Sequence, residues 1–250
     1  MSDAKPERIQ SIDALRGFCV LLMCVHHFLF DIAAFLGAPW WLYENSVFSV
    51  LQYIIAGCFI LLSGISSRFS RSNIRRGLRV IAVALALTLV TWLGDRIAAR
   101  LMGNTGGLTI FFGVLHMLGF SMLFYGLTRK LWDRLPDWAA PILYVLGIVL
   151  TGRCAAGIRG TEIPWLFPFG FITEEFFSGD FYPILPWLFV FLLGTWAGEK
   201  IRLRKLPERF YAAEFRFFPV LGRHALLIYI LHQPILGGFA LLIGRVFGIL

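Results

Sequence analysis

Residues 14–36 read ALRGFCVLLMCVHHFLFDIAAFL and form an almost uninterrupted apolar run. An α-helix rises about 1.5 Å per residue, so a run of this length is long enough to cross the roughly 30 Å hydrocarbon core of a bilayer. No small-residue cleavage site follows it, which predicts a retained span rather than a signal peptide. The run therefore indicates an integral membrane protein.

Further apolar runs, bounded by charges and turn residues, lie at 47–67, 78–97, 108–128, 137–152, 184–199 and 222–246. Of 250 residues, 58% are hydrophobic and 15% are charged, whereas roughly one quarter of a soluble domain is charged. The sequence predicts an all-α fold, a polytopic transmembrane helical bundle of about seven spans. We expect a single domain over 1–250, with a short cytoplasmic tail at 1–11 and a structured outer loop at 153–183.

The basic residues are distributed unevenly between the two sides of this bundle. If the amino terminus is cytoplasmic, 18 of the 23 Lys and Arg residues lie inside. The remaining ones lie outside: Arg96, Arg100, Arg153, Arg159 and Arg245. The positive-inside rule then predicts a cytoplasmic amino terminus and an extracytoplasmic carboxyl terminus, in the cell inner (cytoplasmic) membrane. The same rule accounts for the +8 charge, so no nucleic acid partner is expected.

Titratable side chains inside a span are costly to insert, so each is a functional candidate. In the run HHFLFD, His27 and Asp31 are four residues apart and share one helical face. A carboxylate beside an imidazole stabilises the imidazolium, as a general base requires; the alternative is that Asp31 only satisfies a buried histidine. His116 and His232 reach a similar depth but have no adjacent carboxylate, which is more typical of structural hydrogen-bonding histidines.

Two other groups of residues lie at the ends of spans. Asp180, Tyr182 and Trp187 belong to GDFYPILPW, where two prolines interrupt the backbone, as is common where a cavity is lined; an ordinary turn with an aromatic belt is the alternative. On the inner side, Arg16, Arg76 and Arg223 could bind phosphates through their guanidinium groups, or could be topological charge only. The four cysteines show no CxxC spacing, so neither a disulfide framework nor a metal site is expected.

Six motifs in fixed order carry a resemblance that covers the chain from about residue 8 to residue 243. They are SIDALRG, HHFLFD, FILLSGIS, FGVLHMLG, DFYPILPW and LGRHALLIYILHQP. Together they resemble the catalytic domain family of heparan-α-glucosaminide N-acetyltransferase, in its bacterial form, within the wider transmembrane acyltransferase superfamily. No GxGxxG, Walker, HExxH or GxSxG motif points to another class.

The resemblance implies an acetyltransferase that uses acetyl-CoA, or a similar acyl-CoA, as its donor substrate. The acyl group would pass from the cytoplasm to an acceptor on the other side, an amino sugar or glycan. In this mapping Arg16 and the nearby arginines receive the nucleotide, and His27 is the base that Asp31 orients. His116, His232 and Gln233 are polar wall groups, while the Asp180 segment named above contacts the acceptor.

The chain departs from the eukaryotic enzyme of that family in two respects. It is expected to lack the amino-terminal luminal domain, and His27 stands where that enzyme has asparagine. The enzyme's own catalytic histidine lies beyond the first span, whereas residues 33–46 here contain no histidine. Both direct transfer and transfer through an acyl-histidine are compatible with these residues.

Two other functions use the same residues differently. A proton-coupled small-molecule transporter could use the His and Asp residues as a relay, although seven spans do not divide into two matching halves. A metal or haem site could instead be formed by histidines at one depth on separate helices. Monomer and homodimer are both compatible with the apolar surface that the composition predicts.

Overall fold

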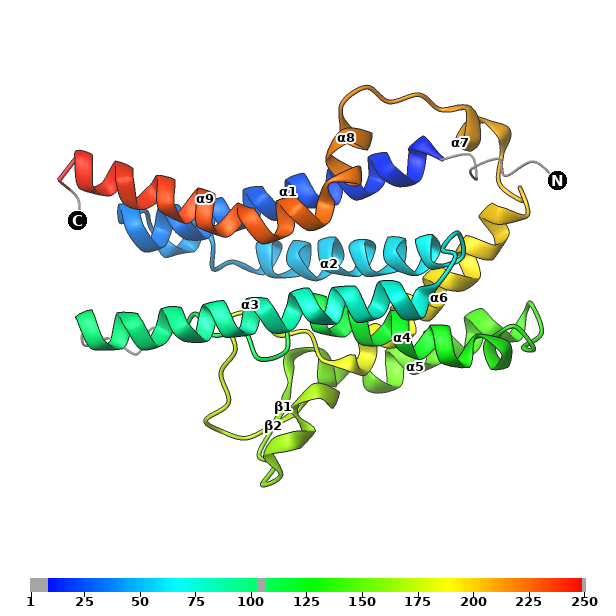
Figure 1. Ribbon diagram of the computed structural model, residues 1–250, viewed down its shortest axis with the longest axis horizontal. Helices are drawn as coiled ribbons and strands as arrows, with labels where there is room; N and C mark the ends of the chain where they lie inside the picture. Colours follow the sequence, from blue (N-terminus) through cyan, green and yellow to red (C-terminus); the bar gives the residue numbers. More distant parts are fainter. Residues whose placement is uncertain (1–8, 103–106, 249–250) are drawn as a thin grey trace. The chain divides into compact units, whose positions relative to one another are not determined.

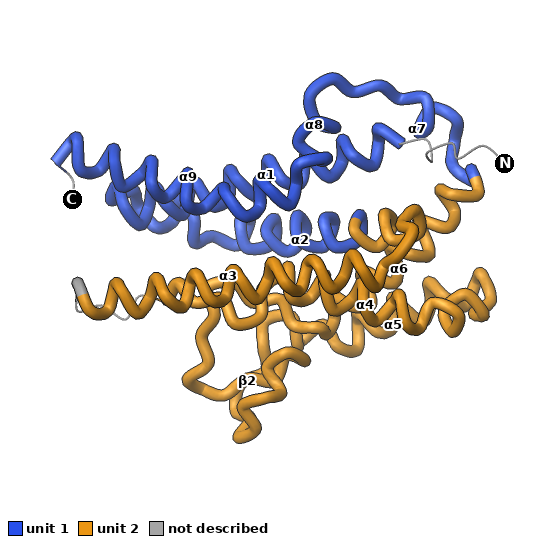
Figure 2. Tube along the Cα trace, viewed as in Figure 1, with its two compact units in different colours: residues 1–62, 204–250 blue, residues 63–203 orange. Residues whose placement is uncertain are grey.

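The computed structural model describes residues 9–102 and 107–248, and it confirms an all-α architecture of long helices. The chain divides into two compact units (Figure 2). Unit 1 comprises residues 1–62 and 204–250, and unit 2 comprises residues 63–203. The boundary lies within one helix, α2 (Ser46–Ser67).

Unit 1 is built around α1 (Gln10–Leu36), which packs along α8 (Phe218–Arg223) and α9 (Ala225–Val246). A 3-10 turn, η1 (Trp40–Leu42), leads from α1 into α2, and a short helix, α7 (Glu208–Ala212), precedes α8. Figure 1 shows α1 and α9 side by side over much of their lengths.

Two glycines allow α1 and α8 to approach each other closely. A Cβ atom at Gly17 would collide with the backbone carbonyl oxygen of Phe218, and one at Gly222 would collide with that of Asp13. Small residues at such crossings let backbones make van der Waals contact, which is the main source of helix association in lipid. The crossing therefore fixes how α8, and α9 directly after it, lie against α1.

Unit 2 contains the end of α2 followed by α3 (Asn73–Met102), α4 (Val114–Trp132), α5 (Ala139–Thr151) and α6 (Ile184–Arg202). The most extensive pairing is that of α3 with α4, and α5 pairs with α6. Gly77 on α3 and Gly119 on α4 lie where these two helices meet. A Cβ atom added at either glycine would approach backbone atoms of the facing helix within 3.0 Å.

The connection between α5 and α6 is folded rather than extended. It contains two 3-10 turns, η2 (Gly152–Ala156) and η3 (Pro164–Phe169), and two short strands, β1 (Ile158–Arg159) and β2 (Phe171–Ile172). The strands pair in parallel, with Ile158 opposite Phe171. Residues 152–172 of this connection therefore form 3-10 turns and a short pair of strands.

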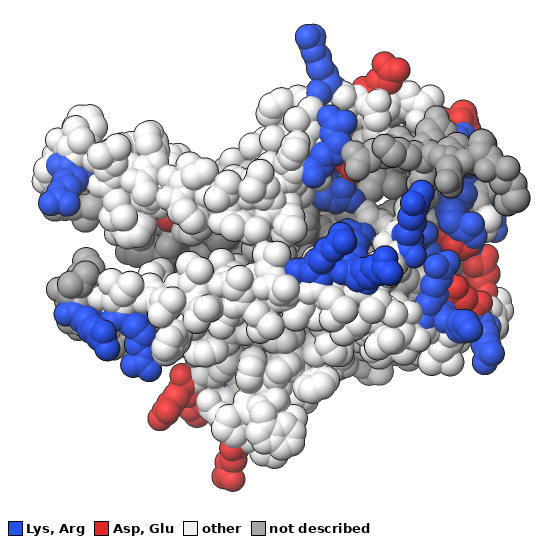
Figure 3. Space-filling view, viewed as in Figure 1, with Lys and Arg blue, Asp and Glu red and all other residues white. Residues whose placement is uncertain are grey.

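Six helices of the described chain are long and apolar enough to cross a membrane, and six of the expected spans coincide with them. They are Gln10–Leu36, Ser46–Ser67, Asn73–Arg100, Ala139–Ala156, Ile184–Arg202 and Ala225–Val246. Figure 3 shows long uncharged stretches over α3 and α9, with Lys and Arg gathered towards helix ends. A multi-pass membrane protein is thus confirmed, whereas the side on which each terminus lies stays a prediction.

The expected span 108–128 requires a correction. The helix in this region, α4, begins at Val114 and is not among the six apolar helices. The residues before it run alongside the segment that leads into α6: the Gly179 N–H donates to the Thr109 carbonyl at 2.9 Å, and the Tyr182 N–H donates to the Phe112 carbonyl at 3.0 Å. Nine of the 19 residues of α4 are buried within unit 2, all of them between Val114 and Tyr125. The polar residues of this part, His116 and Ser121, therefore contact protein, and this part does not need the apolar surface of a lipid-facing span.

The end of α2 generates a test of this packing. A Cβ atom at Gly64 would collide with the Phe191 carbonyl oxygen on α6, so we expect Gly64→Ala to destabilise the protein by about 1–3 kcal/mol. Gly94 on α3 has open space around it, so Gly94→Ala should be neutral or stabilising by up to about 1 kcal/mol. Thermal unfolding in one detergent measures both variants, and an equal effect of the two would contradict the packing described.

Candidate active site

The first cluster of functional side chains lies in unit 1, where α1 and α9 run side by side. The rings of His27 and His232 face each other with centroids 4.8 Å apart and planes inclined by 55°. Their positions follow from the glycine crossing, because His27 is ten residues after Gly17 and His232 is ten residues after Gly222. Two helices that start from a common contact thus deliver two imidazoles to one place.

Asp31 lies one turn beyond His27 and is completely buried. Its Oδ1 atom accepts a hydrogen bond from the amide Nε2 of Gln233 at 2.9 Å. The hydrogen bonds of the described residues do not include one between Asp31 and His27, although both lie on α1 at the spacing that allows it. The carboxylate is therefore positioned by α9 rather than by its neighbour on α1.

The hydrogen bond of His232 identifies its tautomer. The Nδ1 atom is 2.7 Å from the carbonyl oxygen of Tyr229. Since a carbonyl oxygen only accepts, Nδ1 carries the proton, and in the neutral ring Nε2 then holds the lone pair. This Nε2 atom is buried and has no hydrogen-bond partner among the described residues.

Two neighbouring atoms share this property: Asp31 Oδ2 and Gln233 Oε1 are likewise buried, and neither has a partner in the described part of the chain. An unpaired buried polar group costs about 1–3 kcal/mol, and a charged group costs more. Buried polar atoms are hydrogen-bonded in most proteins, so three exceptions in one cluster make it the candidate site for a polar ligand or reactant.

His116, which has a similar expected depth, lies in unit 2 and has a different environment. Its Nδ1 accepts from the backbone N–H of Gly113 at 3.3 Å, and its Nε2 is 3.1 Å from the hydroxyl of Thr88. That hydroxyl donates to the Ile110 carbonyl at 2.6 Å, so it is free to accept from Nε2–H. Both ring nitrogens of His116 are therefore used to join α4 to α3 and to close the first turn of α4.

Asp180, Tyr182 and Trp187 gather at the junction of α4 and α6. The Asp180 carboxylate accepts from the Val114 N–H at 3.0 Å, at the start of α4, where a negative charge is favoured by the helix dipole. The rings of Tyr182 and Trp187 are 5.4 Å apart, and Trp187 is 6% exposed. The expected backbone break is present, because Leu185 has extended φ and ψ angles within α6.

The three arginines proposed for the donor belong to different units. Arg16 on α1 pairs with Asp13 at 2.8 Å, and Arg223 ends α8 with an exposed side chain. Each is adjacent in sequence to a glycine of the α1–α8 crossing, so both belong to the same end of unit 1. Arg76 is half-buried on α3 in unit 2.

These residues can be compared with those of known proteins. Residues 8–234 match the family model described as heparan-alpha-glucosaminide N-acetyltransferase, catalytic. The chain belongs to this family. The match covers both units and includes every candidate residue discussed above, which assigns the protein to the membrane acetyltransferases. Comparisons with curated proteins and with solved structures gave no match.

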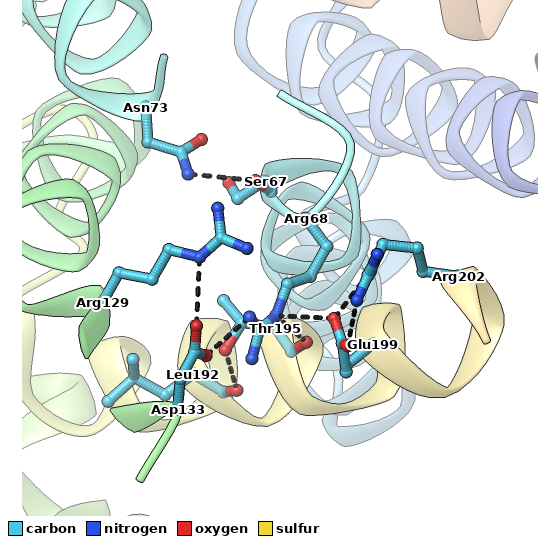
Figure 4. A network of polar contacts seen from close by, with 9 residues as sticks. All are labelled: Ser67, Arg68, Asn73, Arg129, Asp133, Leu192, Thr195, Glu199 and Arg202. Carbon is cyan, nitrogen blue, oxygen red and sulfur yellow. Dashed lines mark hydrogen bonds and ion pairs between the residues drawn. The ribbon is translucent and has the colours of Figure 1, made fainter. Parts of the chain in front are cut away.

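In this family member, the structure also reveals a network that the sequence did not suggest (Figure 4). The guanidinium of Arg68, at the end of α2, pairs with Asp133 at 2.6 Å and donates to the Thr195 carbonyl at 3.0 Å. Its Nε also lies 3.7 Å from Glu199. Arg129 and Arg202 complete the network from α4 and α6.

The network ties the ends of three helices of unit 2 together. Positive charge at a span end, as at Arg68, has a topological explanation. The acidic residues Asp133 and Glu199 at span ends otherwise rich in arginine are the signal that could have identified the network. The Arg68 side chain is 9% exposed, which makes its pairing more than a surface contact. An open pocket of about 230 Å³ lies beside it.

The Arg68 network generates a stability prediction. Arg68→Ala removes a nearly buried cation and leaves two partly exposed carboxylates without it, so we expect a loss of about 1–3 kcal/mol, below the range for a fully buried pair. Arg71→Ala removes an exposed arginine three residues away and should change the free energy of unfolding by less than about 0.5 kcal/mol. Thermal unfolding of both variants in the same detergent would reveal the difference, and equal midpoints would exclude a structural role for the network.

Proposed function

We propose that this protein moves an acetyl or similar acyl group from cytoplasmic acyl-CoA to an acceptor on the extracytoplasmic side, with an amino sugar or glycan as the acceptor class. The observation that carries the proposal is the His27–His232 pair with its three buried, unpaired polar atoms. Family membership supports acyl transfer in general, and the cluster supplies groups that such a transfer uses.

The proposed reaction is nucleophilic attack on a thioester. The acceptor's amine or hydroxyl attacks the carbonyl carbon of acyl-CoA, a new C–N or C–O bond forms, and the C–S bond breaks. An imidazole takes the proton from the attacking atom and gives it to the departing sulfur, so coenzyme A leaves as a thiol. General base catalysis of this kind contributes about 10²- to 10⁴-fold to a rate.

Two imidazoles are available as the base. His27 is the base expected from the sequence, and the lone pair on His232 Nε2 makes the second ring of the pair equally suited to accept a proton. Asp31, held by Gln233, supplies a carboxylate one turn away that stabilises positive charge on the pair. We propose that the two rings and the carboxylate act as one unit.

Donor binding is assigned to the arginines at the α1–α8 end of unit 1. Arg16 and Arg223 offer guanidinium groups that bind phosphate oxygens in a bidentate manner. From Arg16 to His27 the helix rises roughly 16 Å, which suits the extended pantetheine arm of coenzyme A. Arg76, on α3 of unit 2, stays a sequence prediction for donor binding.

A proton-coupled transporter is the second candidate. It would use the same histidines and Asp31 as a relay and would need no acyl donor. For a metal or haem site, the described residues offer no group of three or more His, Cys, Asp or Glu side chains that could hold an ion. Binding of acetyl-CoA separates the acyltransferase from the transporter, because only the acyltransferase requires it.

Replacing the reactive imidazole tests the chemistry. We expect His27→Ala to reduce acetyl transfer from labelled acetyl-CoA to D-glucosamine at least about 100-fold, since a general base is lost, while acetyl-CoA affinity stays nearly unchanged. His224→Ala, at the exposed histidine that follows α8, is the matched control and should retain activity. Unchanged turnover in His27→Ala would remove this residue from the mechanism.

Replacing Arg16 tests the donor site. Loss of a charge-assisted hydrogen bond of about 1.5–3 kcal/mol predicts that Arg16→Ala weakens acetyl-CoA binding about ten- to hundredfold, as measured by calorimetry in detergent. Arg245→Ala removes the same charge from the other end of unit 1 and should leave affinity unaltered. Equal affinities of the two variants would refute the assignment, and no binding to the parent protein would favour transport.

A further inference from the structure

An open pocket of about 560 Å³ lies in unit 1, beside the connection between α1 and α2. Its volume is within the roughly 300–1,000 Å³ typical of small-molecule sites. The residues that line it include His26, Tyr43, Glu44, Asn45, Ser49 and Gln52. These belong neither to the donor site nor to the histidine pair proposed above.

Aromatic contacts bring the connection back along α1. The ring of Trp40 lies 6.0 Å from that of Phe30, and the ring of Tyr43 lies 5.2 Å from Phe30 and 5.0 Å from His26. Since His26 is ten residues before the end of α1, the connection reaches back by roughly 15 Å. The connection thereby places its polar groups beside the middle of α1, near His26, rather than beside the end of that helix.

One of the lining residues, Asn45, is held in place by two hydrogen bonds. Asn45 donates through Nδ2 to the Trp41 carbonyl at 3.0 Å, and its Oδ1 accepts from the Phe48 N–H at 3.0 Å. The second contact caps the first turn of α2. Asn45 thus holds Tyr43 and Glu44, which directly precede it, in a fixed position.

The pocket adjoins the proposed reaction centre through His26. This ring is 5% exposed and lies 5.6 Å from the ring of His27, in an edge-to-face arrangement. His27 in turn lies 4.8 Å from His232. Three imidazoles therefore connect the pocket to the lone pair on His232.

The lining indicates which ligands fit. In the described part of unit 1, it carries one carboxylate, Glu44, together with hydroxyl and amide groups, and no Lys or Arg. Burial, and then the charge of Glu44, raise the pKa of Tyr43, so the phenol keeps its proton and can donate a hydrogen bond. Such a surface repels anions and offers partners for hydroxyl and ammonium groups.

We propose that this pocket is the acceptor site and that it binds a small hydroxyl-rich molecule, neutral or with an ammonium group, rather than an anionic one. Glu44 pairs with the ammonium group, and Tyr43 binds a hydroxyl. This inference rests on the proposed acyl transfer for its role, but the binding itself is independent of any donor. It locates the acceptor beside the α1–α2 connection of unit 1, whereas the role of the Asp180 segment stays a prediction from the sequence.

Calorimetric titration of the full-length protein in detergent, without acetyl-CoA, tests the pocket with three probes: D-glucosamine, D-glucose and D-glucose 6-phosphate. We expect D-glucosamine to bind most tightly and the phosphate ester most weakly. Glu44→Gln should weaken the binding of D-glucosamine about tenfold more than the binding of D-glucose. Tyr43→Phe should weaken the binding of both sugars. Ser49→Trp should abolish binding because the larger side chain fills the pocket. Trp41→Phe, in the same connection but outside the lining, is the control and should bind like the parent.

The outcomes are decisive in both directions. Tightest binding of the phosphate ester, no binding of any sugar to the parent, or parental affinity in all three pocket variants would overturn the proposal. A parallel titration with acetyl-CoA separates the two claims, because we expect the pocket variants to retain parental donor affinity. If the parent bound no acetyl-CoA, the donor assignment would fail, whereas the sugar titrations alone decide the pocket.

Discussion

In lipid the hydrophobic effect does not draw helices together, so close contact between small residues decides which helix faces meet. In unit 1 this contact is the crossing of Gly17 and Gly222, where neither residue has room for a Cβ atom. Because α9 follows α8 directly, the crossing also sets the register of α9 along α1. The histidine pair and the Asp31–Gln233 hydrogen bond are consequences of that register. A bulkier residue at either glycine would therefore displace the histidine pair and Asp31 as well as the helix.

Much of the fold could be predicted from the sequence because a bilayer imposes a minimum length of apolar helix. Six spans were identified from that rule alone, with ends displaced by a few residues. The expected span at 108–128 was placed too early, because its first residues pair with the segment before α6 through backbone hydrogen bonds. Hydropathy contains no information about such a partner, which lies some 70 residues away in the chain.

The candidate site was predicted less completely. The sequence placed three histidines at a similar depth, and two of them, His27 and His232, are in contact. The sequence could not show that both ring nitrogens of His116 would be hydrogen-bonded within unit 2. The four-residue spacing suggested that Asp31 would serve His27, whereas the carboxylate accepts from Gln233 on another helix. Arg68 was hidden for a related reason: positive charge at a span end has a topological explanation, and its acidic partners come from distant segments.

The burial of α4 has a consequence for how the protein is made. A segment that carries His116 and ends in Arg129 and Lys130 is a weak stop for the translocation machinery, because charged and polar residues raise the cost of partitioning into lipid. Its extensive packing on α3 offers a remedy. If α4 crosses the bilayer, it is expected to leave the translocation channel together with α3, as a preassembled hairpin whose polar surface is already covered. Biogenesis would then depend on the glycines between these two helices before any substrate is bound.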